Sequence, residues 1–487
     1  MSQTLKDSSY PGLPTEESIL GDSSDPYHAI RNVLVEDGLF DAEDPNLWRI
    51  ARNPFPLSRD ELSFFQDLGH HLLAFYRALN RLYFESVRGH QPPWVHAYLD
   101  QGKPEALLSF ARMKRFRDLV PGIIRPDVIP TDHGMTITEL DSVPGGIGLT
   151  GSLGGAYEQQ GYQIVGGKDG MVRGFATMIG EFVESSPFPL AIVVSDESAS
   201  YRSEMQWLAN RLTYEGIQAT CVHPKDLEFT EEGLFLPEQY PERAVSVVYR
   251  FYELFDLKNI PKSELVMYSV KKGKAVVTPP YKPWLEEKSA FALVHHPMLE
   301  PYWTKVLSHE TFDLLRRLMP QTWVLDPSPI PPTAIIPGLE VNGRAVSSWR
   351  DLEVTTQKER QYVIKPSGFS ELAWGSRGVF VGHDLPQTEW SAVLQSALDS
   401  FPTTPSVLQV FHKGRQCTLE YYDEQGKNWK SMTGRARLSP YYFVHGDQAE
   451  LGGILATVCP KDKKIIHGMR DAIMAPCMPF QQGTHSS

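Results

Sequence analysis

The spacing of apolar side chains predicts several amphipathic helices in this chain. Residues 59–88 carry leucine and phenylalanine side chains every three or four positions, which predicts one long helix with an apolar face. Further helical patterns lie near 170–184 and within HETFDLLRRLM at 309–319. His70 and His71 lie inside the first helix, where adjacent side chains point apart, so we expect a structural role and not a two-histidine metal site.

Apolar runs bounded by turn residues predict the strands. Residues 189–223 contain the strand PLAIVVS, the helix YRSEMQWLANRLTYEG and the strand IQATCVH, and such a βαβ unit implies parallel strands. A strand at 244–252 follows, and the last third holds the strand-like runs RQYVIKP, RGVFVG and SVLQVFH. Proline-rich loops lie at 278–284 and 326–338. We therefore predict a mixed α/β (α+β) fold with several subdomains.

The composition excludes some classes of function. The 487 residues include 47 Lys and Arg against 59 Asp and Glu, which gives a formal net charge of −12. This balance argues against a nucleic-acid partner, and no apolar run reaches the ~18 residues that a membrane helix needs. The polar and acidic residues 1–25 are predicted to be a disordered or loosely docked tail, and residues 479–487 a second tail.

Several common catalytic and structural motifs are missing from the sequence. It has no Walker A motif, no HExxH and no GxSxG, so a zincin or a serine hydrolase finds no support. The cysteines form no CxxC pair, which suits a reducing cytoplasm and neither a disulfide scaffold nor a zinc ribbon. They lie far apart, at Cys221, Cys417, Cys459 and Cys477.

Residues 124–141 are predicted to form a β-hairpin with its turn at Asp132-His133-Gly134. A three-residue loop would place Thr131 opposite Met135. The same register places Asp127 opposite Glu139 and Arg125 opposite Asp141, and it directs all four side chains to one face. Pro126 lacks a backbone N–H, so we expect its strand to lie at a sheet edge.

The facing carboxylates of this hairpin indicate a bound cation. Two carboxylates directly opposite each other destabilise a sheet unless a positive charge lies between them. Oxygen ligands of this kind suit Mg²⁺ or Mn²⁺, which makes Asp127, Glu139 and Asp141 candidate metal ligands. A surface hairpin with a solvated charged face explains the pattern equally well, because a one-residue slip in register would disperse the cluster.

The glycine-rich tail of the hairpin contains a GxGxxG match at Gly146, Gly148 and Gly151. The match follows a strand, as a dinucleotide fingerprint requires. The hairpin carboxylates would repel a pyrophosphate at this place unless a metal intervenes. We therefore favour a glycine loop packed near a ligand over a dinucleotide-binding turn.

The second half of the chain supplies candidate phosphate-binding residues. Lys365 ends the strand YVIKP beside a glycine-containing loop, so it could reach triphosphate oxygens while the loop closes over them. Arg377 lies in that loop, and Lys288 offers a second cation. Gln409, in the apolar strand SVLQVFHKG, could present its amide to an adenine edge. An ordinary hairpin with a surface lysine explains Lys365 equally well.

Three further arginines are candidates for the site. Arg435 and Arg437 lie two apart and share one face if their segment is a strand. Arg250 ends the strand AVSVVYR, where it could bind a substrate carboxylate or serve as a structural ion-pair partner.

Together these segments resemble the circularly permuted ATP-grasp superfamily, and most closely the amide-ligase domain of the glutathionylspermidine synthase family. The family's RxD and ExN motifs resemble Arg125-Pro-Asp127 and Glu139-Leu-Asp141, with Asp141 where the family has Asn. The resemblance runs in short islands from about residue 110 to 475.

The lysine segments carry the rest of the resemblance. TPPYKPWLEEK, which ends in Lys288, is similar to the family's TPPW-type segment, and Lys365-Pro-Ser-Gly is similar to its nucleotide lysine loop, although the loop here is longer. The metal carboxylates precede the lysines, which is the order that a circular permutation produces.

The resemblance implies an ATP-grasp-like fold with several subdomains around a nucleotide cleft. It implies a ligase domain at 26–478, an inserted βαβ-type substrate subdomain at 189–255 and a nucleotide-binding lobe at 355–478. It also implies Mg²⁺ or Mn²⁺ on the three hairpin carboxylates and catalysis by Arg125, with Arg435 or Arg437 as a further catalytic arginine. The implied ATP-binding residues are Lys288, Lys365, Ser367, Gly368, Arg377 and Gln409.

The expected activity is an ATP-dependent ligase that joins a small-molecule or peptide carboxylate to an amine in the cytoplasm. Two alternatives stay open: a nucleotide-binding dehydrogenase that uses the GxGxxG loop, and a non-catalytic binding protein with the same fold. The sequence names neither substrate and does not set the oligomeric state.

Overall fold

The computed structural model describes residues 26–41, 48–183, 188–331, 334–375, 377–468 and 470–480. The predicted tail at residues 1–25 lies outside this range, as do residues 481–487 of the second predicted tail. Within the described residues, no helix combines the length and the apolar composition that crossing a bilayer requires.

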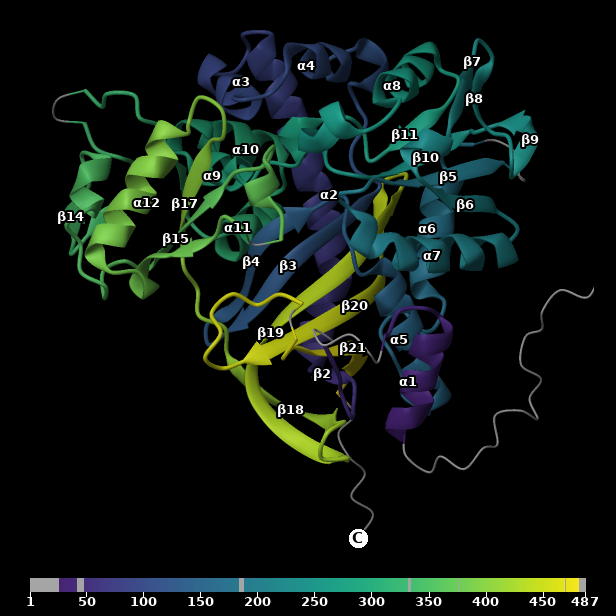
Figure 1. The fold of residues 1–487 in the computed structure, drawn as a ribbon. Helices are drawn as coiled ribbons and strands as arrows, with labels where there is room; N and C mark the ends of the chain where they lie inside the picture. Colours follow the sequence, from purple (N-terminus) through teal and green to yellow (C-terminus); the bar gives the residue numbers. More distant parts are fainter. Residues whose placement is uncertain are drawn as a thin grey trace, which may run out of the picture.

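A mixed eight-stranded sheet forms the centre of the molecule (Figure 1). Its strands are β1 (Arg49–Ile50), β2 (Phe55–Leu57), β3 (Ile123–Thr131), β4 (Gly134–Asp141), β18 (Gln416–Asp423), β19 (Asn428–His445), β20 (Gln448–Pro460) and β21 (Ile473–Pro479). The main order is β1-β21-β20-β19-β3-β4, while β18 pairs with β19 and β2 pairs with β21. The predicted hairpin β3–β4 thus joins strands from the far C-terminal end of the chain.

The long predicted helix is α2 (Arg59–Val87), and it packs against the central sheet. Its N-terminus carries a capping box, in which the Glu61 N–H donates to Ser58 Oγ at 3.2 Å and the Ser58 N–H donates to Glu61 Oε2 at 2.9 Å. Gly69 lets the helix approach closely, because a Cβ there would lie 2.6 Å from the carbonyl oxygen of Ala449. His71 is buried, with Nδ1 2.8 Å from Thr311 Oγ1, as a structural role requires. Its ring centroid lies 3.8 Å from that of His70, so the expectation that the two side chains point apart was wrong.

The predicted βαβ unit belongs to a four-stranded parallel sheet on the right of Figure 1. The order is β11-β10-β5-β6, with β5 (Pro189–Val194), β6 (Gln218–Val222), β10 (Val247–Phe251) and β11 (Val276–Thr278). Helix α7 (Arg202–Tyr214) connects β5 to β6, which confirms the predicted strand–helix–strand arrangement. A small antiparallel sheet of β7 (Glu228–Thr230), β8 (Gly233–Leu236) and β9 (Tyr240–Ala244) lies beside it.

A third sheet, on the left of Figure 1, carries the predicted lysine strand. It is antiparallel in the order β12-β17-β15-β16, with β12 (Thr322–Val324), β15 (Tyr362–Pro366), β16 (Phe380–Val381) and β17 (Ser406–Val410). Together with α12 (Gln387–Asp399) we call it the lysine lobe. The predicted nucleotide-binding lobe at 355–478 spans this sheet, apart from β12, and also β18–β21 of the central sheet.

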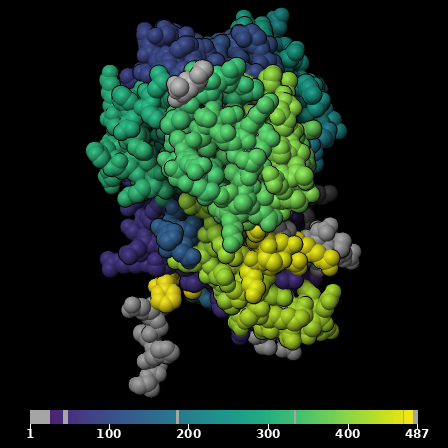
Figure 2. Space-filling view, turned by 90° about the vertical axis from the view of Figure 1, so that its left-hand side faces the viewer, coloured from purple at the N-terminus to yellow at the C-terminus, as the bar shows by residue number. Residues whose placement is uncertain are grey.

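The lysine lobe lies against the segment that follows β20. Figure 2 shows the lysine lobe, in green, directly above the yellow segment that follows β20. An ion pair between Lys464 and Asp384 joins the two.

The other helices of at least seven residues are α1 (Pro26–Glu36), α3 (Pro93–Asp100), α4 (Glu105–Ala111), α5 (Ile147–Gln159), α6 (Gly170–Gly180), α8 (Ser263–Lys272), α9 (Ser289–His295), α10 (Glu300–Val306) and α11 (His309–Leu318).

The β3–β4 hairpin corrects the predicted turn but keeps the predicted facing pairs. Thr131 pairs with Gly134, so the turn has two residues and the predicted three-residue loop was wrong. A β-bulge after Asp127 then places Thr138 as an extra residue on β4. The bulge offsets the shorter turn, so the facing pairs below it are Arg125 with Asp141 and Asp127 with Glu139.

The predicted edge position of Pro126 was also wrong. Its strand β3 lies inside the sheet, between β19 and β4. β19 pairs with β3 at Val128 and again at Ile124, and within the described residues no β19 residue pairs with Pro126 between them. The missing N–H of the proline therefore falls in a gap of the ladder, so an interior strand can hold it.

Candidate active site

A cavity of about 550 Å³ lies where the central sheet, the parallel sheet and the lysine lobe meet. This volume is within the range of small-molecule sites. Its lining combines residues from all three parts of the fold, including Arg125 from β3, Phe251 from β10 and Lys365 from β15. The predicted site residues in the lining are Arg125, Asp127, Glu139, Asp141, Lys288, Lys365, Arg377, Gln409 and Arg437.

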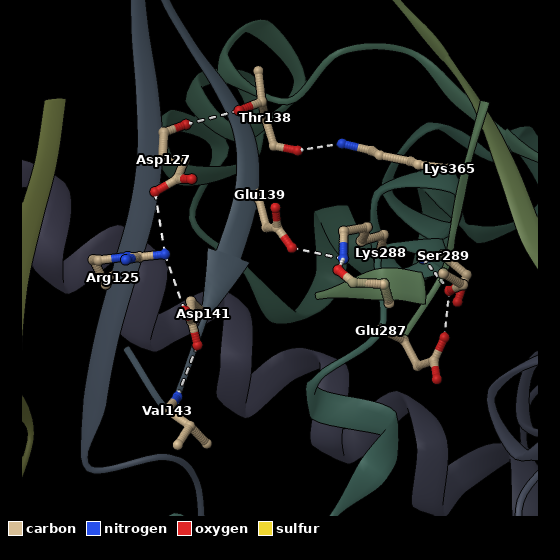
Figure 3. Close-up of polar contacts among 12 residues, drawn as sticks. Arg125, Asp127, Thr138, Glu139, Asp141, Val143, Glu287, Lys288, Ser289 and Lys365 are labelled. Atoms are coloured by element: carbon tan, nitrogen blue, oxygen red, sulfur yellow. Dashed lines mark hydrogen bonds and ion pairs between the residues drawn. The ribbon is translucent and has the colours of Figure 1, made fainter. Parts of the chain in front are cut away.

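Arg125 lies between two of the hairpin carboxylates (Figure 3). Its Nη2 is 3.3 Å from Asp127 Oδ1 and 3.0 Å from Asp141 Oδ2. Asp127 lies two positions along the same strand, and Asp141 lies directly opposite, so the register of the hairpin creates this contact.

Asp127 is held by cations from two strands. Arg437 Nη1 on β19 lies 3.0 Å from Asp127 Oδ2, and Ser439 Oγ donates to Oδ1 at 3.3 Å. Burial alone would raise the pKa of this carboxyl, but Arg125 and Arg437 outweigh burial and lower it. Asp127 is therefore a fixed negative charge at the base of the cavity.

The negative charge of Asp141 is less well balanced by neighbouring cations and hydrogen bonds than that of Asp127. Its Oδ1 accepts a hydrogen bond from the Val143 N–H at 2.8 Å. Burial raises its pKa, and neither Arg125 nor this hydrogen bond offsets the effect, since Glu139 and Asp127 add repulsion. The carboxylate that stands where the resembled motif has Asn thus brings a surplus of negative charge.

Lys288 and Lys365 reach the cavity from different segments of the chain, and both contact residues of β4. Lys288 Nζ lies 2.6 Å from Glu139 Oε1, and it also donates to the Ala373 carbonyl at 3.2 Å. Lys365 Nζ donates to the carbonyl oxygen of Thr138 at 2.8 Å. Thr138 is the bulged residue, so the irregularity in the hairpin supplies the acceptor. Burial lowers the pKa of Lys365 to about 8.

The chemistry of the hairpin suits a hard divalent cation, although each carboxylate already has a cationic partner. Carboxylate oxygens are the ligands that Mg²⁺ and Mn²⁺ prefer, and Asp127, Glu139 and Asp141 line one cavity. In the described part of the chain, no three His, Cys, Asp or Glu side chains form a group that could hold a metal ion. These carboxylates would therefore have to exchange an ion pair for a metal bond.

The glycine-rich segment after β4 packs helices and does not present a phosphate site. Gly146 caps α5 with φ of 89°, and its N–H donates to Glu204 Oε1 at 3.2 Å. The N–H of Leu149 donates to the other oxygen of Glu204 at 3.0 Å. A Cβ on Gly148 would lie 2.8 Å from the backbone of Glu204. A protein carboxylate thus occupies the helix N-terminus that a dinucleotide pyrophosphate would need.

Arg250 and Arg435 do not line the cavity, and both contact other groups of the protein. Arg250 is fully buried, and its guanidinium forms an ion pair with Glu286 and donates to the Tyr252 carbonyl at 2.5 Å. This is the structural ion pair that the sequence left open. Arg435 Nε donates to the Gly414 carbonyl at 3.0 Å, whereas Arg437 on the same strand reaches the cavity.

Ser367, Gln409 and Arg377, which were predicted to bind the nucleotide, contact other side chains of the protein. Ser367 Oγ donates to Glu287 and is fully buried, and Gly368 lines a smaller adjoining cavity of about 70 Å³. Gln409 Nε2 donates to Thr322 Oγ1 at 3.1 Å. Arg377 Nη1 lies 3.1 Å from Glu197 Oε1, an exposed contact between the lysine lobe and the parallel sheet.

Glu253 is a cavity residue that the sequence did not indicate. It lies just after the carboxyl end of β10, where parallel sheets commonly place functional residues, and it lines both cavities. Burial, then Glu286 and Asp141, raise its pKa. Its position after a parallel strand was the one available signal, because its acidic neighbours are distant in sequence.

Comparison with known proteins identifies a shared fold and no family. No protein-family model matches the chain, and no curated protein matches it significantly. A solved glutathione synthetase-like effector from Globodera pallida, in its apo form, matches with a TM-score of 0.56 and 13% sequence identity, over 93% of this chain and 96% of that one. A candidate γ-glutamylcysteine synthetase from Methylobacillus flagellatus matches with a TM-score of 0.37 and 11% identity, over 81% and 83%. The chain therefore shares its fold with a glutathione synthetase-like protein.

Proposed function

We propose that the protein is an ATP-dependent ligase that joins a carboxylate to an amine through an acyl phosphate. The observation that carries the proposal is the single cavity in which Arg125 and three hairpin carboxylates meet Lys288 and Lys365. Such a set of charges suits a bound triphosphate with a divalent cation. The fold shared with a glutathione synthetase-like protein supports the same class of reaction.

Each charged group has a distinct task in this proposal. Lys288 and Lys365 bind phosphate oxygens, and Arg125 stabilises the phosphoryl group during its transfer. Arg437 holds Asp127 in place at 3.0 Å. Asp127, Glu139 and Asp141 are the residues that would hold Mg²⁺ or Mn²⁺, which when bound would neutralise charge on the β- and γ-phosphates.

The reaction consists of two transfers at one substrate carboxylate. An oxygen of the carboxylate attacks the γ-phosphorus of ATP, and the bond to the bridging oxygen breaks to release ADP. The amine then attacks the acyl carbon, inorganic phosphate leaves and the amine nitrogen loses a proton, which gives the amide. The cavity contributes mainly positioning and fixed charge, as is general for phosphoryl transfer.

A screen for ADP release tests the proposal. Purified protein with Mg²⁺ and ATP is offered pairs of carboxylates and amines, including amino acids, small peptides and polyamines. We expect ADP release that depends on both substrates and on Mg²⁺. Glu139→Gln should abolish it, whereas Asp447→Asn, which alters a side chain that is 93% exposed, should not. ADP release at the wild-type rate by Glu139→Gln would refute the assignment.

The two alternatives predict different outcomes of simple assays. A dehydrogenase would quench NADH fluorescence without Mg²⁺, but Glu204 already occupies the helix N-terminus that this would need. A non-catalytic relative would bind ATP and release no ADP with any pair of substrates. The expected ADP release excludes both.

A further inference from the structure

A buried ion pair lies directly behind the Lys288 segment. Lys103 Nζ is 2.6 Å from Glu287 Oε1, and the two side chains are 0% and 2% exposed. Lys103 lies in the turn between α3 and α4, and Glu287 is the residue before Lys288. Burial of two charges costs desolvation energy that their attraction often fails to recover, so stability alone is a weak explanation for the pair.

Glu287 joins the two lysine segments to each other. Its second oxygen accepts a hydrogen bond from Ser367 Oγ, and the same hydroxyl oxygen accepts the Ser289 N–H at 2.9 Å. The Lys288 N–H donates to the Ser367 carbonyl at 2.7 Å. Ser367 lies two residues after Lys365 in the chain. These bonds therefore fix the backbone of one nucleotide lysine to the segment that carries the other.

The packing around Glu287 leaves little room for adjustment. A Cβ on Gly368 would lie 2.7 Å from Glu287 Oε1 and 2.8 Å from the Glu286 carbonyl oxygen. The Ser-Gly pair after Lys365 thus fits against Glu287, and its tight spacing accounts for the glycine. Figure 3 shows Glu287 and Lys288 pointing in different directions, with Lys288 toward Glu139 in the cavity.

We propose that Lys103 and Glu287 are positioning residues that align Lys288 and Lys365 for the nucleotide phosphates. This inference rests on the proposed ligase function. Lys103 neutralises Glu287, so the carboxylate can tie the two segments together without attracting the Lys288 ammonium away from the cavity. If Lys103 is removed, an unpaired buried carboxylate remains one residue from Lys288 and competes with the phosphates for it.

The test compares Lys103→Met, Glu287→Gln and the double variant. Binding of Mg²⁺–ADP is measured by calorimetry, and unfolding by urea is measured in parallel. We expect Lys103→Met to weaken nucleotide binding about tenfold, because a charge is left unpaired in a buried site. Glu287→Gln removes the competing charge and keeps one acceptor for Lys103, but it loses one of the two oxygens that join the segments, so it should weaken nucleotide binding less than Lys103→Met does. Adding it to Lys103→Met should restore binding to within about threefold.

A matched control separates positioning from loss of stability. Lys282 is also buried, and its Nζ donates to Asn80 Oδ1 and to the carbonyls of Arg117 and Leu119, outside the cavity. Lys282→Met should therefore lower stability but leave the dissociation constant for Mg²⁺–ADP unchanged. If Lys103→Met does not fold, Lys103→Gln carries the same expectation.

The possible outcomes distinguish this inference from the proposed function. In turnover with saturating carboxylate and amine, Lys103→Met should raise KM for ATP more than it lowers kcat. Wild-type affinity in Lys103→Met would overturn the inference and leave the ligase proposal intact. Equal weakening in Lys103→Met and the double variant would overturn it too, because the loss would not then come from the unpaired carboxylate. A wild-type protein that binds no nucleotide would overturn both proposals.

Discussion

Asp127→Asn and Glu139→Gln should both abolish ADP release, but they should differ sharply in their effect on stability. Each variant replaces one candidate metal ligand by an amide of nearly the same shape. Both carboxylates line the same cavity and face each other across the hairpin. The difference arises from the number of cations that each carboxylate holds and from how deeply it is buried.

The size of the difference in unfolding free energy between the two variants follows from the exposure and the ion pairs of the two carboxylates. The Asp127 side chain is 8% exposed and holds Arg125 at 3.3 Å and Arg437 at 3.0 Å. Loss of one partner of a buried ion pair costs about 3–5 kcal/mol, because the other charge stays buried without compensation. The Glu139 side chain is 35% exposed and pairs with Lys288 alone among the described cations. Lys288 itself is only 11% exposed, so loss of this single pair should cost more than the roughly 1 kcal/mol of a surface pair but less than loss of the two contacts of Asp127.

Equilibrium urea unfolding followed by circular dichroism measures the difference, with ADP release measured on the same preparations. The urea midpoint of Asp127→Asn should fall well below that of Glu139→Gln. Equal midpoints for the two variants would refute the reasoning, because Asp127 would then not carry the charge of the two arginines. Glu139→Gln is consequently the cleaner probe of the metal assignment.

The other predictions concern charge, pH and the glycine segment. Burial raises the pKa of Asp141, so the protonated carboxyl stabilises the fold at low pH, and this stabilisation is lost as the pH rises through that pKa. Asp141→Asn should therefore raise the urea midpoint at pH 7 or leave it unchanged, and a fall in the midpoint would contradict this. The pKa of Lys365 near 8 predicts about tenfold weaker ADP binding at pH 9 than at pH 7, and calorimetry of Lys365→Met should show no such change. Glu204→Ala should lower the free energy of unfolding by about 1–2 kcal/mol through loss of the α5 cap, while NADH fluorescence stays unquenched by the wild-type protein. Mn²⁺ binding followed by electron paramagnetic resonance should strengthen when ADP is added, and equal affinity with and without ADP would contradict the coupling.

Local patterns in the sequence predicted the elements but not their irregularities. The periodicity of 59–88 gave the helix Arg59–Val87, and the apolar runs of 189–223 gave the parallel βαβ unit. The facing pairs of the hairpin were right although its turn was wrong, because the bulge at Thr138 added the residue that the shorter turn removed. A bulge of this kind has no compositional signature, so sequence periodicity cannot locate it.

Residues whose role depends on distant segments were not predictable in the same way. Ser367 and Gly368 fit a nucleotide loop in sequence, yet in the fold they contact Glu287, which lies 80 residues from Ser367. For Arg250 the sequence left substrate binding and a structural ion pair equally open, because nothing near it in sequence indicates Glu286. The burial that raises the pKa of Glu253 likewise arises only when the sheets come together. The assignments of metal ligands and nucleotide residues, and the permuted order, stay predictions.

The charges in the cavity are arranged so that phosphate and metal should assist each other. Arg125 and Lys288 each lie within 3.3 Å of a hairpin carboxylate, so two of the groups proposed to contact phosphate are paired with groups proposed to bind the metal. A cation that leaves its carboxylate for a phosphate exposes a buried negative charge, which is costly unless a divalent ion replaces it. A divalent ion that takes the carboxylates likewise frees the cations for phosphate. Each ligand thus removes the cost of binding the other, and the coupling is reciprocal by thermodynamic necessity.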